Sequence, residues 1–250
     1  MPILYILGGL AALFLLYILF LTFCSIPVST KKEYNTHSGF YRFLLDSATF
    51  CAVKLLRIRV SVTGQDKLPA EGRFLLVSNH ISNFDPILTW YALPSYKLAF
   101  VSKPSNFKIP WFGRIIRKCC FMAIDRENPR NAIRTINRAA ELIKNDQVSI
   151  GIYPEGTRSK TGELLPFHNG VFKIAQKANV PIVVAGLSGT ETIRKQTPLR
   201  TSRVYLDILE VIPAETVCST KTDQLGQQVR TLLEENSAKR QSNLNNKERL

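Results

Sequence analysis

An apolar run opens the chain. Residues 3–26 contain no Lys, Arg, Asp or Glu. As a helix this run would be roughly 36 Å long at about 1.5 Å per residue, which is enough to cross a bilayer. A cleaved signal peptide would need a positively charged segment before the apolar run, and none is present. We therefore expect a retained membrane anchor. Lys31 and Lys32 follow it directly, which indicates that its C-terminal side faces the cytoplasm.

A second stretch, residues 38–57, repeats large apolar residues at near-helical spacing. Arg42, Lys54 and Arg57 interrupt the pattern, and charges at these positions disfavour a second full span. An amphipathic helix lying in the membrane interface fits the pattern, and packing on the soluble part of the chain is the alternative. We therefore expect residues 1–57 to form a two-helix membrane-binding element.

From residue 58 onward, short β-type runs alternate with helical patterns. Strands are expected at 58–62, 74–78, 98–102, 121–124, 148–153, 181–187 and 204–208. Helices are expected at 86–92, 129–144, 169–178 and 224–235. This alternation predicts an α/β domain over residues 58–236, in which helices flank a largely parallel sheet. The tail, residues 237–250, is polar and is expected to be disordered.

Composition adds a strong positive charge to this picture. The chain has 33 Lys and Arg against 19 Asp and Glu, a formal net charge of +14. Such a surface favours anionic lipids, phosphorylated substrates or nucleic acid, and no nucleic-acid-binding motif is present. The three histidines lack the spacing of metal ligands, so no metal site is expected. The five cysteines fit no zinc or disulfide pattern, which favours reduced thiols in a reducing compartment.

One segment, Asn79 to Pro86, carries residues suited to acid–base chemistry. It follows an expected strand and precedes an expected helix, where α/β proteins place reactive groups. His80 can act as a general base near neutral pH, and a tight turn would bring Asp85 back to orient its ring. The alternatives are a structural histidine and an Asp that caps the helix before Pro86. The Asp can fill both roles because a carboxylate has two oxygens.

Basic and hydroxyl side chains follow three other expected strands. Lys103 follows the strand 98–102, and Arg126 follows the strand 121–124. The loop after residue 153 contains Glu155, Gly156, Thr157, Arg158 and Ser159. A glycine lets backbone amides approach an anion, and the planar fork of an arginine suits phosphate. An ordinary turn and surface ion pairs are the alternatives, but the convergence of these strand ends predicts a phosphate site beside His80.

Four blocks in this order resemble the motifs of the glycerolipid acyltransferases. They are Asn79-His80 with Asp85, Phe121 to Arg126, Glu155 to Ser159, and Val180 to Val183. The resemblance covers about residues 35–215 and is greatest to bacterial family members that acylate 1-acyl-sn-glycerol-3-phosphate. The chain departs from the family at Val184, where many members have a second proline, and at Cys119-Cys120, upstream of the second block.

The resemblance implies a glycerol-3-phosphate acyltransferase-like fold and a function. His80 would be the general base oriented by Asp85. Arg126 and the loop 155–159 would bind the acceptor phosphate, with Lys103 near them. The reaction would move a fatty acyl group from acyl-CoA or acyl-carrier protein to the sn-2 hydroxyl of lysophosphatidic acid, giving phosphatidic acid at the cytoplasmic face of the cell membrane. It would require no metal or cofactor.

Two other functions remain open at this level. The acceptor would instead be another lysophospholipid or a lyso-aminolipid if internal ion pairs occupy the arginines. A protein of a different class, a catalytically silent membrane-anchored protein that binds anions, would use the charge without needing His80 or Asp85.

Overall fold

The computed structural model describes residues 2–124, 129–197 and 199–248. Its centre is a β-sheet. The strands are β1 (Ile58–Thr63), β2 (Leu75–Ser78), β3 (Leu98–Ser102), β4 (Met122–Ala123), β5 (Ser149–Ile152), β6 (Ile182–Ser188) and β7 (Ser202–Ile212). β2 and β5 are buried over their whole length, and β3 and β6 are buried at all but their last residue. Near-continuous apolar runs of this kind are typical of strands covered on both faces. The predicted α/β architecture is therefore confirmed.

Within the described residues the sheet has seven strands in the order β1-β7-β6-β2-β5-β3-β4. Among these described strands, β6 and β7 pair antiparallel and the other neighbours run parallel. β2, β5, β3 and β4 are consecutive in space, so their carboxyl ends lie along one edge. The register pairs Val77 with Ile152 and Val101 with Met122, so the loops after these strands begin close together.

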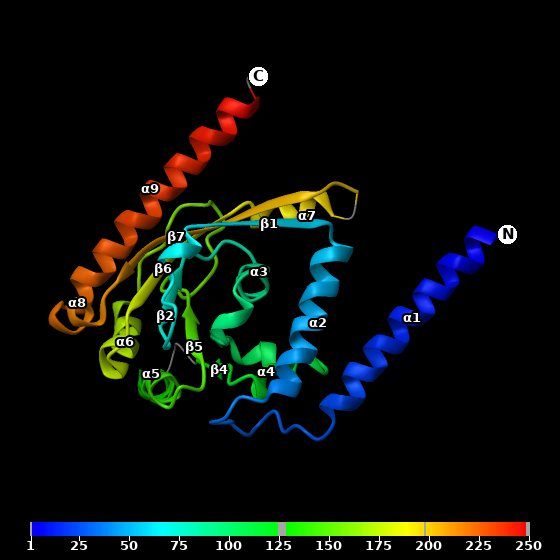
Figure 1. Ribbon diagram of the computed structural model, residues 1–250, viewed down its shortest axis with the longest axis horizontal. Helices are drawn as coiled ribbons and strands as arrows, with labels where there is room; N and C mark the ends of the chain where they lie inside the picture. The colour runs from blue at the N-terminus through cyan, green and yellow to red at the C-terminus, as the bar shows by residue number, and fades with distance from the viewer. Residues whose placement is uncertain (1, 125–128, 198, 249–250) are drawn as a thin grey trace.

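Helices cover both sides of this sheet (Figure 1). The α-helices are α1 (Pro2–Ser25), α2 (Gly39–Leu55), α3 (Asp85–Ala92), α4 (Phe112–Lys118), α5 (Pro129–Lys144), α6 (Lys173–Ala178), α7 (Ile193–Gln196), α8 (Ala214–Ser219) and α9 (Thr222–Glu248). Short 3-10 turns are η1 (Gln65–Lys67), η2 (Pro94–Tyr96), η3 (Pro104–Lys108), η4 (Asn169–Phe172) and η5 (Thr190–Thr192). α2 packs against α3 and α4, whereas α6 packs against α5 and α9 packs against β6.

The two N-terminal helices differ in how they meet the domain. α1 is exposed over most of its length and contacts the rest of the chain near its C-terminal end, where Leu21 is buried and Tyr17 shares a hydrogen bond with Ser47 of α2. By length and composition its segment from Leu4 to Ser25 could cross a membrane. α2 buries one face on the domain and leaves Phe40, Phe43 and Phe50 exposed. The predicted second helix is therefore present and packs one face on the domain. That its exposed face lies in the membrane interface stays a prediction.

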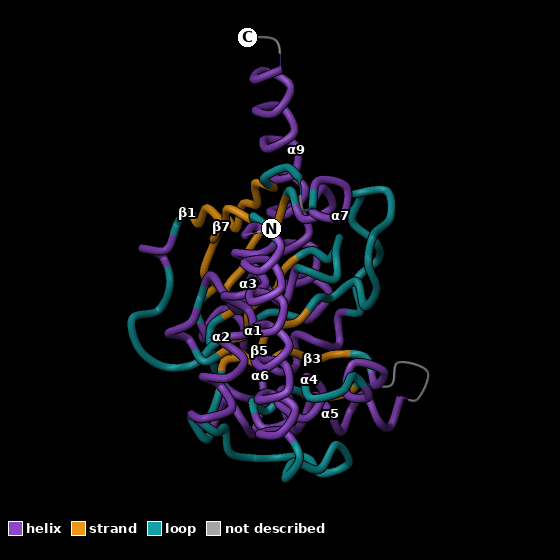
Figure 2. The backbone as a smooth tube through the Cα atoms, turned by 90° about the vertical axis from the view of Figure 1, so that its right-hand side faces the viewer, coloured by secondary structure: helices purple, strands orange, loops and turns teal. Residues whose placement is uncertain are grey.

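Helix α9 differs from the prediction. The sequence pattern placed its end near residue 235 and a disordered tail after it, whereas the helix continues to Glu248 and extends past the domain (Figure 2). Arg240 explains part of the difference, because its guanidinium pairs with the buried Asp207 of β7 and lies over the ring of Tyr205. α4, α7 and α8, of four to seven residues each, were not predicted. Helical periodicity needs a window longer than these segments.

Candidate active site

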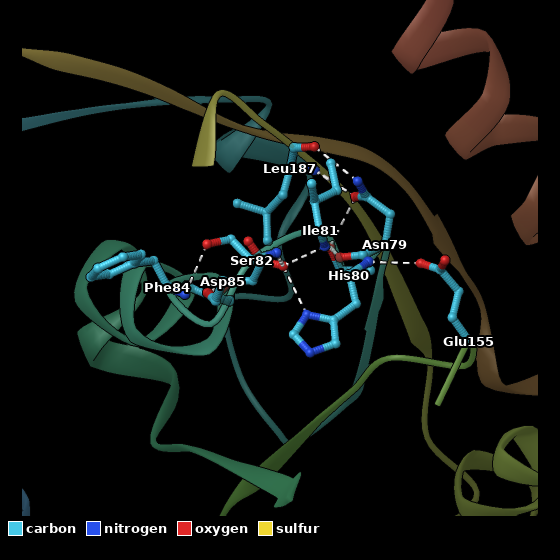
Figure 3. A network of polar contacts seen from close by, with 10 residues as sticks. Asn79, His80, Ile81, Ser82, Phe84, Asp85, Glu155 and Leu187 are labelled. Carbon is cyan, nitrogen blue, oxygen red and sulfur yellow. Dashed lines mark hydrogen bonds and ion pairs between the residues drawn. The ribbon is translucent and has the colours of Figure 1, made fainter. Parts of the chain in front are cut away.

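His80 and Asp85 form a hydrogen-bonded pair directly after β2 (Figure 3). The Nδ1 atom of His80 lies 2.8 Å from Oδ2 of Asp85. The Asp85 side chain is completely buried, while 17% of the His80 side chain remains exposed. The pairing predicted from the five-residue spacing is therefore present, and part of the His80 side chain remains exposed.

Backbone amides orient the Asp85 carboxylate. The same oxygen, Oδ2, accepts hydrogen bonds from the amides of Ile81 at 2.7 Å and Ser82 at 2.8 Å. A carboxylate oxygen that already accepts two N–H groups can only accept from the ring as well. Nδ1 of His80 is then the protonated nitrogen, and Nε2 keeps a lone pair for a proton. Asp85 also begins α3, but its side chain makes no capping hydrogen bond to that helix, so the carboxylate orients His80 without the capping role.

Glu155 and Ser159 bind the backbone of His80 from the neighbouring strand loop. Oε1 of Glu155 accepts the His80 amide at 2.7 Å, and the Ser159 amide donates to the His80 carbonyl at 2.8 Å. The second oxygen of Glu155 accepts the Leu165 amide at 2.9 Å. Burial raises the pKa of the Glu155 carboxyl, and these amide hydrogen bonds oppose the shift. Both carboxylate oxygens of Glu155 therefore accept backbone hydrogen bonds, although the sequence analysis expected Glu155 to bind substrate.

Of the other residues in the loop 155–159, two stabilise its turn and two lie on the surface. Gly156 has φ 71°, a left-handed conformation that favours glycine, and its amide donates to the carbonyl of Tyr153. The Ser159 hydroxyl is buried and accepts the Gly162 amide at 3.0 Å. Thr157 and Arg158 are exposed. This turn keeps the loop fixed and leaves the Arg158 guanidinium available to a ligand.

A cavity of about 760 Å³ joins these groups. His80, Lys103, Gly156 and Arg158 all line it, together with His168, which the sequence analysis did not assign to a site. Much of the remaining wall is apolar: Leu45, Ile87, Trp90, Phe100, Val101, Ile109, Phe112, Ile116, Phe121, Ile124, Ala132, Ile136 and Ile152. One compartment therefore combines an imidazole, cationic groups and a surface suited to an alkyl chain.

The structure brings together most of the predicted site residues. His80, Lys103, Gly156 and Arg158 share the cavity, whereas Glu155, Thr157 and Ser159 do not line it. Arg126, the remaining predicted phosphate ligand, lies outside the described residues.

Three features of the site were missed from the sequence. Asn79 connects β2 to β6, because its side-chain nitrogen donates to the Leu187 carbonyl and its oxygen accepts the Leu187 amide. Trp90 of α3 lines the cavity and donates to Asp46 of α2 at 2.6 Å. Tyr153 lies against the His80 ring. These contacts join residues far apart in the chain, so no local sequence pattern predicts them.

The chain is similar to known proteins of one family. A family model described as Acyltransferase matches residues 59–188, more than half of the chain. The sheep protein named 1-acyl-sn-glycerol-3-phosphate acyltransferase alpha is 28% identical over 220 residues, covering 86% of this chain and 74% of the sheep chain. A coconut protein named 1-acyl-sn-glycerol-3-phosphate acyltransferase is 33% identical over 144 residues, covering 58% of this chain and 46% of its own.

A solved structure resembles the whole arrangement. The 1-acyl-sn-glycerophosphate (LPA) acyltransferase PlsC from Thermotoga maritima superposes with a TM-score of 0.66 at 25% identity, covering 80% of this chain and 81% of its own. The matched family segment contains the His80–Asp85 pair and the loop 155–159. The chain belongs to the acyltransferase family.

Proposed function

We propose that this protein transfers a fatty acyl group from acyl-CoA or acyl-carrier protein to the sn-2 hydroxyl of lysophosphatidic acid, giving phosphatidic acid. One observation carries the proposal. The cavity that contains the His80 ring, braced by Asp85, also contains the cationic side chains of Lys103 and Arg158 and a long apolar wall. Such a cavity matches an acceptor with a hydroxyl, a phosphate and an acyl chain.

The acceptor phosphate binds Arg158 and Lys103 in this proposal. Both side chains are exposed and have no ion-pair partner among the described residues, so a phosphomonoester does not have to displace an internal carboxylate. An arginine fork can bind two phosphate oxygens at once. The phosphate site then places the sn-2 hydroxyl near Nε2 of His80.

Nε2 of His80 takes the hydroxyl proton while the hydroxyl oxygen attacks the thioester carbonyl carbon. The carbonyl electrons move to oxygen and give a tetrahedral oxyanion. The amide of Gly156 is used within its turn, so the amides of Thr157 and Arg158 are the donors we assign to this oxyanion. When the C–S bond breaks, the leaving thiolate takes the proton from His80. The products are the ester and the free thiol.

The membrane location follows from the N-terminal helices and the charge. We propose that α1 anchors the protein in the cell membrane, with Lys31, Lys32 and the domain on the cytoplasmic side. Acceptor and product both remain in the bilayer, so an anchored site meets them at the surface. The acyl donors are acidic and soluble, and the net charge of +14 favours their encounter with the protein.

The purified full-length chain tests the proposal. It is incubated with lysophosphatidic acid and either acyl-CoA or acyl-carrier protein, and the product is identified by mass spectrometry. Monoacylglycerol, lysophosphatidylcholine and a lyso-aminolipid serve as acceptors that lack the phosphomonoester. We expect phosphatidic acid as the preferred product. Equal or greater turnover of an acceptor without a phosphomonoester would reject the assignment of the phosphate site.

A further inference from the structure

The ring of Tyr153 lies flat against the imidazole of His80. The ring centroids are 4.3 Å apart and the planes differ by 17°. Tyr153 follows β5 and is buried, whereas His80 follows the neighbouring strand β2. The Asp85 carboxylate contacts the edge of the imidazole at Nδ1, while the tyrosine covers one of its faces. Two contacts in different directions thus define the orientation of the ring.

Tyr153 is itself held within a line of aromatic rings. On β3, Phe100 lies parallel to it at 6.1 Å with an interplanar angle of 7°. Phe100 contacts Phe121, and Phe121 contacts Trp90, each with centroids 5.6 Å apart. Trp90 belongs to α3, the helix that begins with Asp85. This line of rings therefore runs from His80, through Tyr153, to α3, the helix that carries Asp85.

The sequence makes room for this arrangement at Gly151 of β5. A Cβ atom there would lie 2.4 Å from the Phe100 ring, so any larger residue would displace that ring. Phe100 could then no longer lie parallel to Tyr153. The glycine is thus required because the Phe100 ring packs directly over its backbone.

A stacked phenol ring has a chemical consequence when His80 takes a proton. The face of an aromatic ring carries negative charge density and attracts a cation above it. A neutral imidazole gains little from this contact, whereas an imidazolium gains more. Burial, together with the charge of Asp85, raises the pKa of the Tyr153 phenol, so this ring stays neutral.

We propose that Tyr153 is a positioning residue for the acyl transfer, whose ring fixes the plane of the His80 imidazole and stabilises the imidazolium formed as the acceptor hydroxyl loses its proton. The proposal rests on the proposed function, because it assigns His80 as the base. Other titratable or charged groups around the imidazole belong to the same site: Lys103, Asp85, Glu155, Arg158 and His168. They are unchanged in every variant below, so differences between variants report the ring.

Three replacements of Tyr153 separate ring shape from ring electrostatics. Tyr153→Phe keeps the ring and removes the hydroxyl. Pentafluorophenylalanine at position 153 keeps the shape and reverses the charge distribution on the ring face. Tyr153→Leu removes the ring. For each variant we would measure kcat, both KM values and the pH dependence of kcat/KM with lysophosphatidic acid and acyl-CoA.

We expect Tyr153→Phe to keep kcat within about twofold of the unmodified protein. The fluorinated variant should lose kcat by roughly three- to thirtyfold, the range between an exposed and a desolvated cation–π contact. Its KM values should stay within about twofold. Because its imidazolium is destabilised, the acidic limb of the kcat/KM profile should move to lower pH. Tyr153→Leu should show the same shift and a larger loss of kcat.

Equal kcat and pH profiles for the phenylalanine and fluorinated variants would overturn the electrostatic role. The fluorinated ring keeps the planar outline of phenylalanine and is slightly larger, so thermal unfolding of these two variants accompanies the kinetics. Their comparison holds even if Tyr153→Leu does not fold. A second measurement needs no substrate. NMR of histidine-labelled protein follows the titration of His80, assigned with His80→Ala, and the fluorinated variant should titrate at lower pH than the phenylalanine variant. An unchanged titration would reject the stacking proposal, whereas absent turnover of lysophosphatidic acid would reject the proposed function.

Discussion

The two chemical ends of the cavity are built in different ways. At the base end, the Asp85 carboxylate is completely buried and accepts three hydrogen bonds on one oxygen, while Glu155 and Ser159 hold the backbone of His80. At the cationic end, Lys103 and Arg158 are exposed side chains without an ion-pair partner in the described part of the chain.

This difference corresponds to what each end has to do. A proton transfer requires the base within hydrogen-bond reach of the hydroxyl, so its position must be set before substrate arrives. A phosphate carries its own charge and can order flexible cations as it binds. We therefore expect changes at the base end to act on kcat and changes at the cationic end to act on KM.

The largest expected effect is that of His80→Ala. Loss of a general base reduces turnover by roughly 10²- to 10⁴-fold, and we expect kcat to fall in this range without a comparable change in KM for lysophosphatidic acid. His37→Ala is the matched control, because this histidine does not line the cavity. Steady-state kinetics on both variants, with thermal unfolding in detergent as a folding check, makes the comparison. Near-normal kcat for His80→Ala would contradict the assignment of the base.

Glu155→Gln tests whether the position of His80, at the base end, depends on Glu155, a residue that does not line the cavity. A glutamine has one acceptor oxygen, so one of the amides of His80 and Leu165 would face an N–H group. A buried unsatisfied group costs about 1–3 kcal/mol. We expect a lower melting temperature and, because His80 moves, a roughly tenfold loss of kcat with little change in KM.

Glu163→Gln, an exposed carboxylate in the same loop, is the control for Glu155→Gln and should behave like the unmodified chain. If Glu155→Gln raised KM for lysophosphatidic acid at unchanged kcat, Glu155 would belong to the substrate-binding group after all.

Arg158→Ala should act at the other end of the cavity. A hydrogen bond to a charged group contributes about 1.5–3 kcal/mol, so we expect KM for lysophosphatidic acid to rise by roughly tenfold or more and kcat to change less. The KM of Arg158→Lys for lysophosphatidic acid should lie between those of the unmodified protein and Arg158→Ala, because lysine keeps the charge but lacks the planar guanidinium fork. Arg200→Ala removes an exposed arginine away from the cavity and controls for total charge. A rise confined to the KM of the acyl donor would place Arg158 on the other substrate.

The smallest effect is expected far from the cavity, at Arg240. Burial acts to raise the pKa of the Asp207 carboxyl, but hydrogen bonds from Arg240 and Thr63 outweigh it and lower that pKa. A lowered pKa stabilises the fold above the ordinary pKa of an aspartate, and this contribution is lost as the pH falls through the lowered value. Arg240→Ala should therefore destabilise the chain by about 1 kcal/mol at pH 7 and by less near pH 3, with kcat unchanged.

Lys239→Ala on the same helix is the control for Arg240→Ala, and chemical unfolding at the two pH values makes the measurement. An equal loss of stability at both pH values would show that Arg240 acts through packing on Tyr205 rather than through charge.

Much of the fold was predictable because its signals are local. The strand and helix patterns between residues 58 and 212 gave the α/β class and placed His80, Lys103 and Arg158 at strand ends. The order of strands was not predictable in this way. β6 and β7 pair antiparallel, and β1 joins the sheet through β7 rather than through β2. Pairing depends on which apolar faces meet, and periodicity along the chain carries no information about this.

The amino-acid sequence by itself determined the apolar N-terminal segment, the positive charge, the α/β alternation and the residue types needed for base and phosphate chemistry. Tertiary structure alone decided how those residues are used. It directed Glu155 to the backbone of His80 instead of to the cavity, and placed Tyr153 against a ring 73 positions earlier in the chain. The physical reason is that hydrophobic patterning acts within a few residues, whereas a hydrogen bond or a ring contact between neighbouring strands exists only after the sheet has assembled.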